Sequence, residues 1–452
     1  MQLYNYHTDS CFTVWSDEMK GILSPLYYIS APKDTSGLVF LKDAAVVNPS
    51  RKTHKVNDTE IVPYVGLPET DDKKVRMVLH RPYKEVAGRN IIKIGDILFA
   101  RIEPSVFNKK YIYVDNLDGA DHAYTSTEFY IIQAKDEVNP HYLFSILFSD
   151  TVFKQIIGKT TGSTGRRRLD RSAFENILIP LPPRKKQDKI AALYLKSEQQ
   201  KNKLEAQAKL LLHSLSDYVL TKLQTELPEK TDDFIYSAWT DEIDYRVDPF
   251  YFHPNRQNAI KALRNSKHKL LSLKQVVRFK RDIVDKIDGT LPYLGLENIV
   301  SNTGEYEETT DKTSISSAFR FDTNNVLFPK LRPYLNKVYC AEFPGLCSTE
   351  FHVLEPKECD PYYLYAFLSS DIVVRQTSYL MTGNTLPRLQ TEDVEKLLIP
   401  IPSIGIQREI ASEVRSKKTQ AKALLLEAKK STEDTSKEIE RMMLGEIYGK
   451  NN

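Results

Sequence analysis

The sequence predicts an α+β fold in which two duplicated α/β-mixed domains are separated by two long helices. Three observations predict this architecture. Short segments recur along the chain in the same order, at a spacing of 220 to 229 residues. Each copy mixes β-like runs with turn residues and short helices. Each copy then ends in a charged stretch that has coiled-coil periodicity and contains neither Pro nor Gly.

The recurring segments indicate an internal duplication. Their spacing is far longer than the roughly 20–50 residues of a solenoid repeat, so we interpret the copies as duplicated domains. The matched pairs are Trp15–Glu18 with Trp239–Glu242, Pro63–Leu67 with Pro292–Leu296, Leu98–Pro104 with Leu327–Pro333, Ser126–Phe129 with Ser348–Phe351, Pro140–Leu143 with Pro361–Leu364, and Ile179–Pro182 with Ile399–Pro402.

The elements of each copy follow from local residue types. Ile97–Ala100 and Phe129–Ile132 are apolar runs that predict buried strands. Pro140–Phe153 and Pro361–Val374 predict helices, because Pro is favoured in the first turn of a helix. The Ile-Pro-x-Pro segment that follows predicts an end to regular structure, because Pro lacks an N–H donor and restricts the residue before it.

The closing stretch of each copy predicts a long helix with one seam of recurring positions. A helix of roughly 40 residues is about 60 Å long. Neither seam can bury itself, so we expect the two helices to pack on each other. The alternative is that each helix is solvated and uses a different partner. The seam positions are Leu204, Ala208, Leu211, Leu215, Tyr218 and Lys222 in the first stretch, and Ile410, Val414, Lys417, Ala421, Leu424, Ala428 and Ser431 in the second.

These elements divide the chain into four segments. We expect a first domain over 1–183, a central long helix over 184–228, a second domain over 229–403, and a C-terminal long helix over 404–450.

The composition indicates an ordinary soluble globular protein. The chain has 452 residues, 41% of them hydrophobic and 27% charged, and a formal net charge of +3. So small a net charge restricts any nucleic-acid contact to a local basic patch. The four Cys residues form no CxxC pair, which favours reduced thiols. The sequence shows no signal-peptide pattern and no apolar stretch near the roughly 18 residues that span a membrane, so we expect a cytoplasmic protein that contacts no membrane.

The sequence lacks the common signatures of catalysis and cofactor binding. Neither the GxGxxG nor the GxxxxGK[ST] phosphate loop occurs, and HExxH and the His and Cys spacings of metal sites are also missing. We therefore predict a chain with no catalytic residue, no metal and no cofactor of its own.

The strongest candidate for nucleic-acid binding is a basic loop within residues 154–171. This segment holds six basic residues against one acid, and its small central residues let backbone N–H groups approach phosphates. Arg side chains can fork onto phosphate or onto guanine. The second copy keeps a Thr-Gly-x-Thr loop and one Arg; the alternative interpretation is a solvated surface run. The candidates are Lys159, Thr161, Ser163, Thr164, Arg166, Arg167, Arg168 and Arg171 in the first copy, and Thr382, Asn384, Thr385 and Arg388 in the second.

A second candidate surface is the turn that follows the strand near residue 100 and its repeat near residue 330. Basic residues interleaved with an aromatic residue suit nucleic-acid contact, although separate surface charges would give the same pattern. The candidates are Arg101, Lys109 and Lys110 in the first copy, and Lys330, Arg332, Tyr334 and Lys337 in the second.

With these motifs in order, the chain resembles the specificity subunits of Type I restriction–modification systems over its full length. The segments that carry the resemblance are Gly95–Leu98, Thr161–Thr164, and Ile179–Pro183 with Gln187 downstream. The second copy departs from the pattern, because Asn324–Leu327 replaces Gly-Asp-Ile-Leu and Ser403 replaces the second Pro.

The resemblance implies more than the residues themselves do. It implies two target-recognition domains, and long helices that pair as an antiparallel coiled coil. It implies a non-catalytic subunit that reads a bipartite, asymmetric target in double-stranded DNA. Two copies of an adenine-methylating modification subunit and a motor/nuclease restriction subunit would join it. S-adenosylmethionine, Mg and ATP are then expected on those partner subunits.

Two alternatives from other classes stay open at this point. One is an enzyme with an unrecognised centre, such as a DNA methyltransferase or a nuclease, which binding of S-adenosylmethionine or metal by the purified protein would reveal. The other is an assembly scaffold or a DNA reader in another phage-defence complex, which its co-purifying partners would reveal.

Overall fold

The computed structural model describes residues 37–51, 56–71, 73–86, 90–162, 167–232, 235–238, 243, 248–285, 291–308, 317–382 and 387–448. The chain divides into two compact units. Unit 1 comprises residues 1–201 and 429–452, and unit 2 comprises residues 202–428. Each unit therefore contains one of the duplicated domains together with parts of both long helices, α6 (Arg184–Lys222) and α12 (Ile404–Tyr448).

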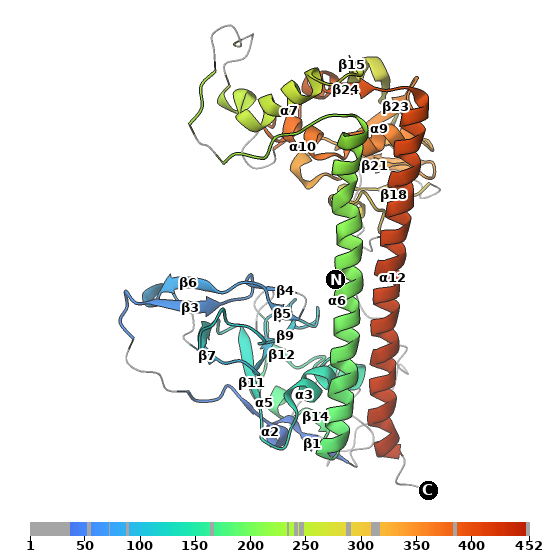
Figure 1. Ribbon diagram of the computed structural model, residues 1–452. Helices are drawn as coiled ribbons and strands as arrows, with labels where there is room; N and C mark the ends of the chain where they lie inside the picture. Colours follow the sequence, from blue (N-terminus) through green and yellow to red (C-terminus); the bar gives the residue numbers. More distant parts are fainter. Residues whose placement is uncertain are drawn as a thin grey trace. The chain divides into compact units, whose positions relative to one another are not determined.

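The first domain, in unit 1, packs helices on a large sheet and the large sheet on a small one (Figure 1). Its elements before α6 are β1 (Leu38–Phe40), α2 (Leu41–Ala44), β2 (Ala45–Val47), β3 (Ile61–Val65), β4 (Thr70–Asp71), β5 (Lys74–Val75), β6 (Leu79–Pro82), η1 (Tyr83–Glu85), β7 (Asn90–Ile92), β8 (Ile97–Ala100), β9 (Tyr111–Tyr113), β10 (Ala123–Thr125), β11 (Phe129–Ala134), α3 (Pro140–Leu147), α4 (Asp150–Lys154), β12 (Thr160–Thr161), β13 (Arg168–Leu169), α5 (Arg171–Glu175) and β14 (Leu178–Pro180).

The second domain, in unit 2, is built from the same kinds of element. They are η2 (Pro249–Phe252), α7 (Pro254–Arg264), β15 (Lys269–Ser272), α8 (Leu273–Val276), β16 (Val277–Lys280), β17 (Ile283–Val284), β18 (Tyr293–Leu294), η3 (Leu296–Asn298), β19 (Ala318–Phe321), β20 (Val326–Pro329), η4 (Pro333–Leu335), β21 (Tyr339–Cys340), β22 (Gly345–Ser348), β23 (Phe351–Pro356), α9 (Pro361–Leu368), α10 (Asp371–Ser378), α11 (Thr391–Glu395) and β24 (Leu398–Ile401).

The sheet topology confirms the duplication. In the first domain, β2, β11, β8 and β9 are neighbours in that order, and β16, β23, β20 and β21 repeat the order in the second. The pair β1–β14 recurs as β15–β24. The small sheets share a parallel pair, β3 with β10 and β18 with β22, next to an antiparallel strand. The α+β fold predicted from the repeats is thus present in both copies.

The small sheets differ only at their outer strands. The first domain adds β6 beyond β3, whereas the second adds β17 beyond β19. Two domains that share a fold but differ in the edge strand of the small sheet present different surfaces to a partner.

The predicted strands near residues 97 and 129 are confirmed as β8 and β11. The two helices predicted after them are wrong as single helices. Each consists of two helices. Ser149 is the N-cap residue of α4, and its hydroxyl accepts a hydrogen bond from the Val152 N–H; Ser370 is the N-cap residue of α10, but its hydroxyl donates to the Phe367 carbonyl. Ser competes with helical hydrogen bonds in a helix interior and is favoured at an N-cap.

The departure of the second copy from Gly-Asp-Ile-Leu has a conformational reason. Gly95 and Asn324 both have positive φ, 91° and 67°, and Gly and Asn tolerate this region best. Asp96, which is buried, receives a two-pronged ion pair from Arg51. The equivalent Asn325 accepts a hydrogen bond from the Asp322 N–H at 2.9 Å, and Asp96 accepts the matching one from the Lys93 N–H at 2.7 Å. The neutral amide fits a site that has no arginine partner in the described part of unit 2.

The long helices bear out the predicted seams. Leu204, Ala208, Val414 and Ala421 are buried, and the remaining seam positions are buried or half-buried. The predicted end of the first helix at residue 228 is six residues too late. Gln224 adopts a left-handed conformation, and the Thr225 N–H bonds back to the Leu220 carbonyl, which stops the helix at Lys222.

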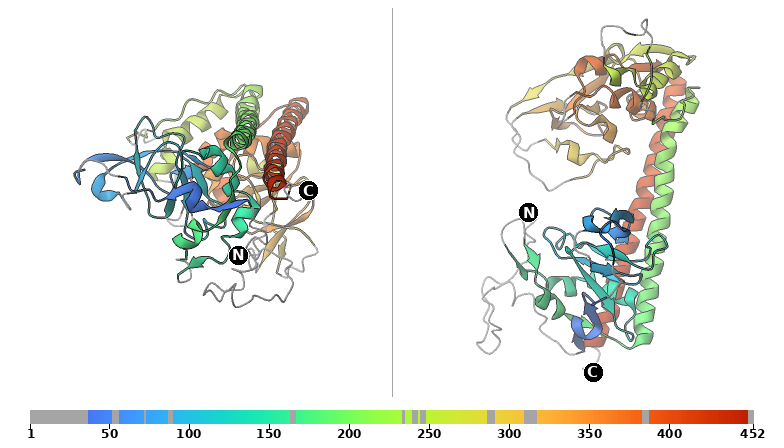
Figure 2. Two further views of the ribbon diagram at one scale, coloured as in Figure 1. Left: turned by 90° about the horizontal axis from the view of Figure 1, so that it is seen from below. Right: turned by 90° about the vertical axis from the view of Figure 1, so that its left-hand side faces the viewer.

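Within each unit the helices run side by side (Figures 1 and 2). In unit 2, Ser214 of α6 accepts a hydrogen bond from Lys417 of α12, and Lys222 pairs with Glu409. The residue number thus falls along one helix as it rises along the other, so the pairing is antiparallel. In unit 1, the start of α6 shares a core cluster with Ile439 and Met443, near the end of α12.

The recurring motifs converge where each domain meets its long helix. In the first domain, the buried Gln187 side chain accepts a hydrogen bond from the Asn139 N–H at 2.8 Å and donates one to the Pro182 carbonyl at 2.9 Å. Tyr142 donates to the Pro180 carbonyl at 2.7 Å. Tyr142 belongs to the repeat segment Pro140–Leu143, and Pro180 and Pro182 belong to Ile179–Pro182, so two of the repeats mark the attachment of the domain to its helix.

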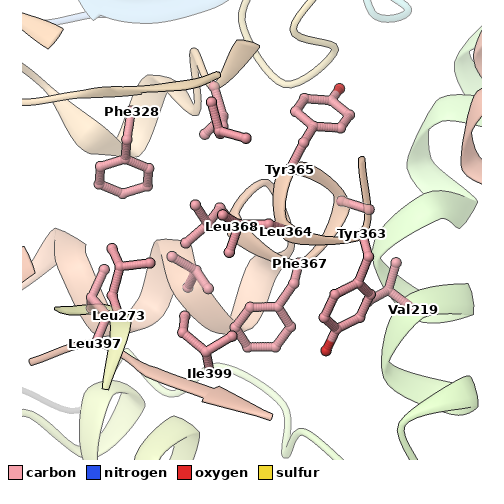
Figure 3. Packing of buried hydrophobic residues seen from close by; sticks show 14 of the residues in the cluster. Val219, Leu273, Phe328, Tyr363, Leu364, Tyr365, Phe367, Leu368, Leu397 and Ile399 are labelled. Atoms are coloured by element: carbon pink, nitrogen blue, oxygen red, sulfur yellow. The ribbon is translucent and has the colours of Figure 1, made fainter. Parts of the chain in front are cut away.

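The second domain has the same attachment. Gln407 accepts from the Asp360 N–H and donates to the Pro402 carbonyl, both at 2.9 Å. Tyr363 donates to the Pro400 carbonyl at 2.6 Å. Figure 3 shows the apolar core beside it, where Tyr363 and Phe367 of α9 lie close to Val219 of α6 and Ile399 of β24.

Candidate nucleic-acid interface

One Arg of the basic loop, present in both copies, forms a forked ion pair inside its own domain. Arg168 donates from Nε and Nη2 to the two carboxylate oxygens of Glu128, at 3.0 and 2.5 Å. Arg388 does the same to Glu350, at 3.0 and 2.7 Å. The hydrogen bonds that each guanidinium donates to its carboxylate raise the pKa of that guanidinium above its usual value. This geometry suits a positioning role.

The fork holds the stem of the loop against the end of β8 or β20. The backbone of Arg168 forms an isolated antiparallel β-bridge with Ile102 in the first domain, and the backbone of Arg388 forms one with Leu331 in the second. The first stem is the β12–β13 hairpin, in which Thr161 lies opposite Arg168. In the second, Thr382 lies opposite Arg388. Thr161 and Thr382 are both exposed.

The rest of the basic loop is only partly described. Arg167 is about half exposed; its side chain donates to the Thr160 carbonyl at 3.0 Å and lies 3.8 Å from Glu103. Arg171 is also about half exposed and pairs with Glu175 at 2.8 Å. Lys159 is half-buried. The other predicted residues lie outside the described residues: Ser163, Thr164, Arg166, Asn384 and Thr385.

Most lysines of the predicted basic turn are held by backbone carbonyls. Lys110 donates to Leu67 at 2.8 Å, and Lys337 donates to the equivalent Leu296 at 2.8 Å. Lys109 donates to the Phe148 carbonyl at 3.3 Å. These amines therefore stabilise the fold of their own domain.

Arg101 and Lys330 occupy equivalent positions in the two domains. The Arg101 guanidinium lies 5.0 Å from the Tyr130 ring centroid, and its buried Nε has no hydrogen-bond partner in the described chain. Lys330 donates to the Thr349 carbonyl at 2.6 Å. Burial lowers its pKa below the usual value. Both cations are partly buried, so neither offers a free surface charge.

Two residues of the second turn are exposed and suited to contact. Arg332 and Tyr334 both face solvent, and Tyr334 is 45% exposed. Among the described residues, the Arg332 side chain has no hydrogen-bond or ion-pair partner. Its equivalent, Glu103, instead accepts a hydrogen bond from Thr160 at 2.5 Å. The two copies therefore present opposite charge at the same position.

Sequence analysis missed a basic strand at the edge of the first small sheet. Strand β6 and the residues after it expose His80, Arg81 and Lys84. The Arg81 guanidinium lies 5.5 Å from the ring centroid of Tyr64. The run Leu79–Lys84 combines basic residues with an aromatic residue, which is the composition expected of a nucleic-acid contact. Its composition could therefore have indicated this strand as a candidate.

A buried histidine beside Lys330 gives the second domain a pH-dependent stability. Burial, together with the positive charges of Lys330 and Arg281, lowers the pKa of His352 to about 3. The unfolded imidazole has a pKa near 6.5, so between these values only the unfolded chain binds the proton. The contribution of neutral His352 to the free energy of unfolding is fully present above about pH 6.5 and is lost as the pH falls towards about 3. At pH 5 the loss is about 2 kcal/mol.

Urea unfolding at pH 7 and pH 5 checks this expectation. In a His352→Phe variant, the loss of stability between the two pH values should be smaller by about 2 kcal/mol. An equal loss in the variant and the unaltered chain would assign the acid sensitivity to other groups.

Within the described ranges, no three His, Cys, Asp or Glu residues are placed to hold a metal ion. None of the described helices is long and apolar enough to cross a membrane.

Comparison with known proteins gives a family match over both domains. The model of the Type I restriction modification DNA specificity domain matches residues 37–212 and 269–416, more than half of the chain. The EcoDI specificity subunit of a Type I restriction enzyme from Escherichia coli is 28% identical over 176 residues, which cover 36% of this chain and 39% of that protein. The EcoEI specificity subunit from the same organism is 26% identical over 210 residues, which cover 44% and 34%.

The match therefore spans about two fifths or less of the length of these curated relatives. Among solved structures, the S subunit of a Type I restriction–modification system from M. genitalium aligns with a TM-score of 0.44 and 14% identity, covering 92% of this chain and 98% of that one.

Proposed function

The chain belongs to the family of the Type I restriction modification DNA specificity domain, and from this premise we propose that its two domains each read one half of a bipartite DNA target. Two readers joined by a helical spacer contact two separated clusters of bases and leave the bases between them unread. The target is asymmetric, because the two readers present different side chains.

The observation that supports this proposal is that the two domains share the same backbone arrangement but differ in the side chains around it. Both domains hold a loop stem with the same Arg–Glu fork, Arg168 with Glu128 and Arg388 with Glu350. The side chains around the stems differ, as at the partly buried Glu103 and the exposed Arg332. The shared backbone arrangement would position each domain on DNA in the same way, and the different side chains would recognise different bases.

The proposal also assigns partners. The chain recruits modification subunits, two copies by the two-fold repeat, and a restriction/motor subunit. S-adenosylmethionine, Mg and ATP then act on those partners, while this chain supplies recognition without a cofactor. Such an assembly acts on double-stranded DNA in the cytoplasm.

Arg332 offers a direct test of DNA contact. Replacing it with Ala should weaken binding to a duplex of mixed sequence about tenfold and reduce the slope of log affinity against log salt by about 0.9, because one phosphate contact is lost. Fluorescence anisotropy of a labelled duplex across a salt series measures both quantities. Tyr334→Ala should weaken binding without changing the slope.

Arg264→Ala is the matched control, since Arg264 is an exposed Arg at the end of α7 in the same domain. If Arg332→Ala and Arg264→Ala change affinity and slope equally, the turn at residue 332 does not contact DNA.

A further inference from the structure

Beyond the shared Gln attachment, a turn of each domain forms an ion pair with its own long helix, and in unit 2 the same Glu305 carboxylate also lies 3.8 Å from Lys422. In unit 1, Lys73 lies in the turn between β4 and β5, beside α6 (Figure 1). Its Nζ is 3.1 Å from Oε1 of Glu198, and the two side chains are 23% and 10% exposed. The same amine lies 4.7 Å from the ring centroid of Phe148. The pair is therefore largely shielded from water.

Unit 2 has an ion pair at the same place. Lys418 of α12 is 3.0 Å from Oε1 of Glu305, in a turn of the second domain, and the side chains are 10% and 28% exposed. The Lys418 amine also donates to the Tyr365 hydroxyl at 2.8 Å. The same hydroxyl donates to the Thr303 carbonyl at 2.9 Å, which ties the turn to the helix.

The two helix positions are equivalent. Glu198 follows Gln187 by eleven residues, and Lys418 follows Gln407 by eleven residues. The turns are equivalent as well. Lys73 and Asn302 each lie ten residues after the Pro of the shared Pro-Tyr segment, and both have positive φ, 68° and 64°.

The sign of the charge is reversed between the copies. In unit 1 the domain supplies the cation and the helix supplies the anion, whereas in unit 2 the domain supplies the anion and the helix the cation. A domain with Lys73 placed against Lys418 would face a like charge, as would Glu305 placed against Glu198. Like charges held together in a partly desolvated contact oppose docking, and oppositely charged pairs favour it.

The Gln attachment cannot make this distinction, because Gln187 and Gln407 form the same hydrogen bonds. It also holds the domain at one end only. The second contact lies eleven residues along the helix, about 16 Å away at 1.5 Å per residue. Two contacts at that separation fix how the domain is oriented on its helix, while one would let it pivot.

We propose that the helix surface around Glu198 accepts only a domain whose turn carries a cation, and the surface around Lys418 only one whose turn carries an anion. The first fifteen residues of each long helix, up to Glu198 or Lys418, thus form part of the recognition module that precedes them. A recognition domain exchanged between chains with its boundary at residue 183 or 403 would be separated from the oppositely charged residue on its helix. A domain exchanged together with its helix residues through 201 or 421 would keep that residue.

Charge reversal in the full-length chain tests this proposal. Glu198→Lys gives α6 the residue that α12 carries, and Lys418→Glu does the converse. In each variant the amides of the facing turn, at residues 73–78 or 300–307, should exchange with deuterium at least tenfold faster. Adding Lys73→Glu to the first variant, or Glu305→Lys to the second, should restore slow exchange.

Gln199→Lys and Thr419→Glu are the matched controls, since they place the same charged residue at the next, exposed helix position and should leave the turns protected. If slow exchange of the turns returns in the doubly substituted chains, the single variants fail because like charges face each other and not because the chain misfolds. Turns that stay protected in Glu198→Lys and Lys418→Glu, or double variants that exchange as fast as the single ones, would overturn the proposal.

Discussion

Replacing Gln407 with Leu is expected to lower the free energy of unfolding of the second domain by about 3 kcal/mol. The side chain is 2% exposed and satisfies two backbone groups, the Asp360 N–H and the Pro402 carbonyl. Leucine has a similar volume and no polar atom, so both groups would be buried without a partner, and each such group costs about 1–3 kcal/mol.

Urea unfolding and the hydrogen exchange of the Asp360 amide measure the effect. Gln420→Leu is the control, because Gln420 is exposed on the same helix and bonds only to Ser416 among the described residues. The equivalent Gln187→Leu should produce a loss of similar size in unit 1. A cost below about 0.5 kcal/mol, as for an ordinary surface substitution, would mean that the Gln does not hold domain and helix together.

Replacing Leu211 with Pro is expected to cost roughly 3 kcal/mol or more, because Pro removes one helical hydrogen bond and clashes with the preceding turn. Leu211 lies in the half of α6 that packs against α12 within unit 2. The break should release the contacts that follow it, from Ser214 with Lys417 to Lys222 with Glu409. We also expect loss of partner-subunit binding while the first domain stays folded.

Helical circular dichroism and hydrogen exchange of α6 and α12 report this change. Leu211→Ala is the control, because it trims the same side chain and leaves the backbone helical. Unchanged protection along α6 and α12 in Leu211→Pro, together with intact complex formation, would contradict the role of helix pairing.

The sequence was sufficient to predict the elements that depend on local pattern. The duplication, the strands near residues 97 and 129, and the two long helices follow from repetition and periodicity. The breaks at Ser149 and Ser370 were missed because the apolar pattern continues across them. Each Ser precedes an Asp, a pairing typical of a helix start, so the signal was present.

The candidate interface was harder to predict, because the partner of a charged side chain is set by tertiary contacts. Lys110 and Lys337 count as basic residues in the sequence, yet their amines bond to carbonyls of their own domain. Arg168 and Arg388 recur together with the Glu of the Ser-Thr-Glu-Phe segment. That joint recurrence was the available sign of an internal pair.

Mapping methylated adenines in cells that carry this chain and the modification subunit that we propose as its partner tests the central claim most directly. Two readers predict a bipartite, non-palindromic motif with a fixed gap of unspecified bases. Exchanging residues 239–403 for the equivalent segment of a relative, together with the helix residue that matches position 418, should change one half of the motif and leave the other intact. Lengthening α6 should change only the gap. A single continuous motif, or a symmetric one, would contradict the two-reader account.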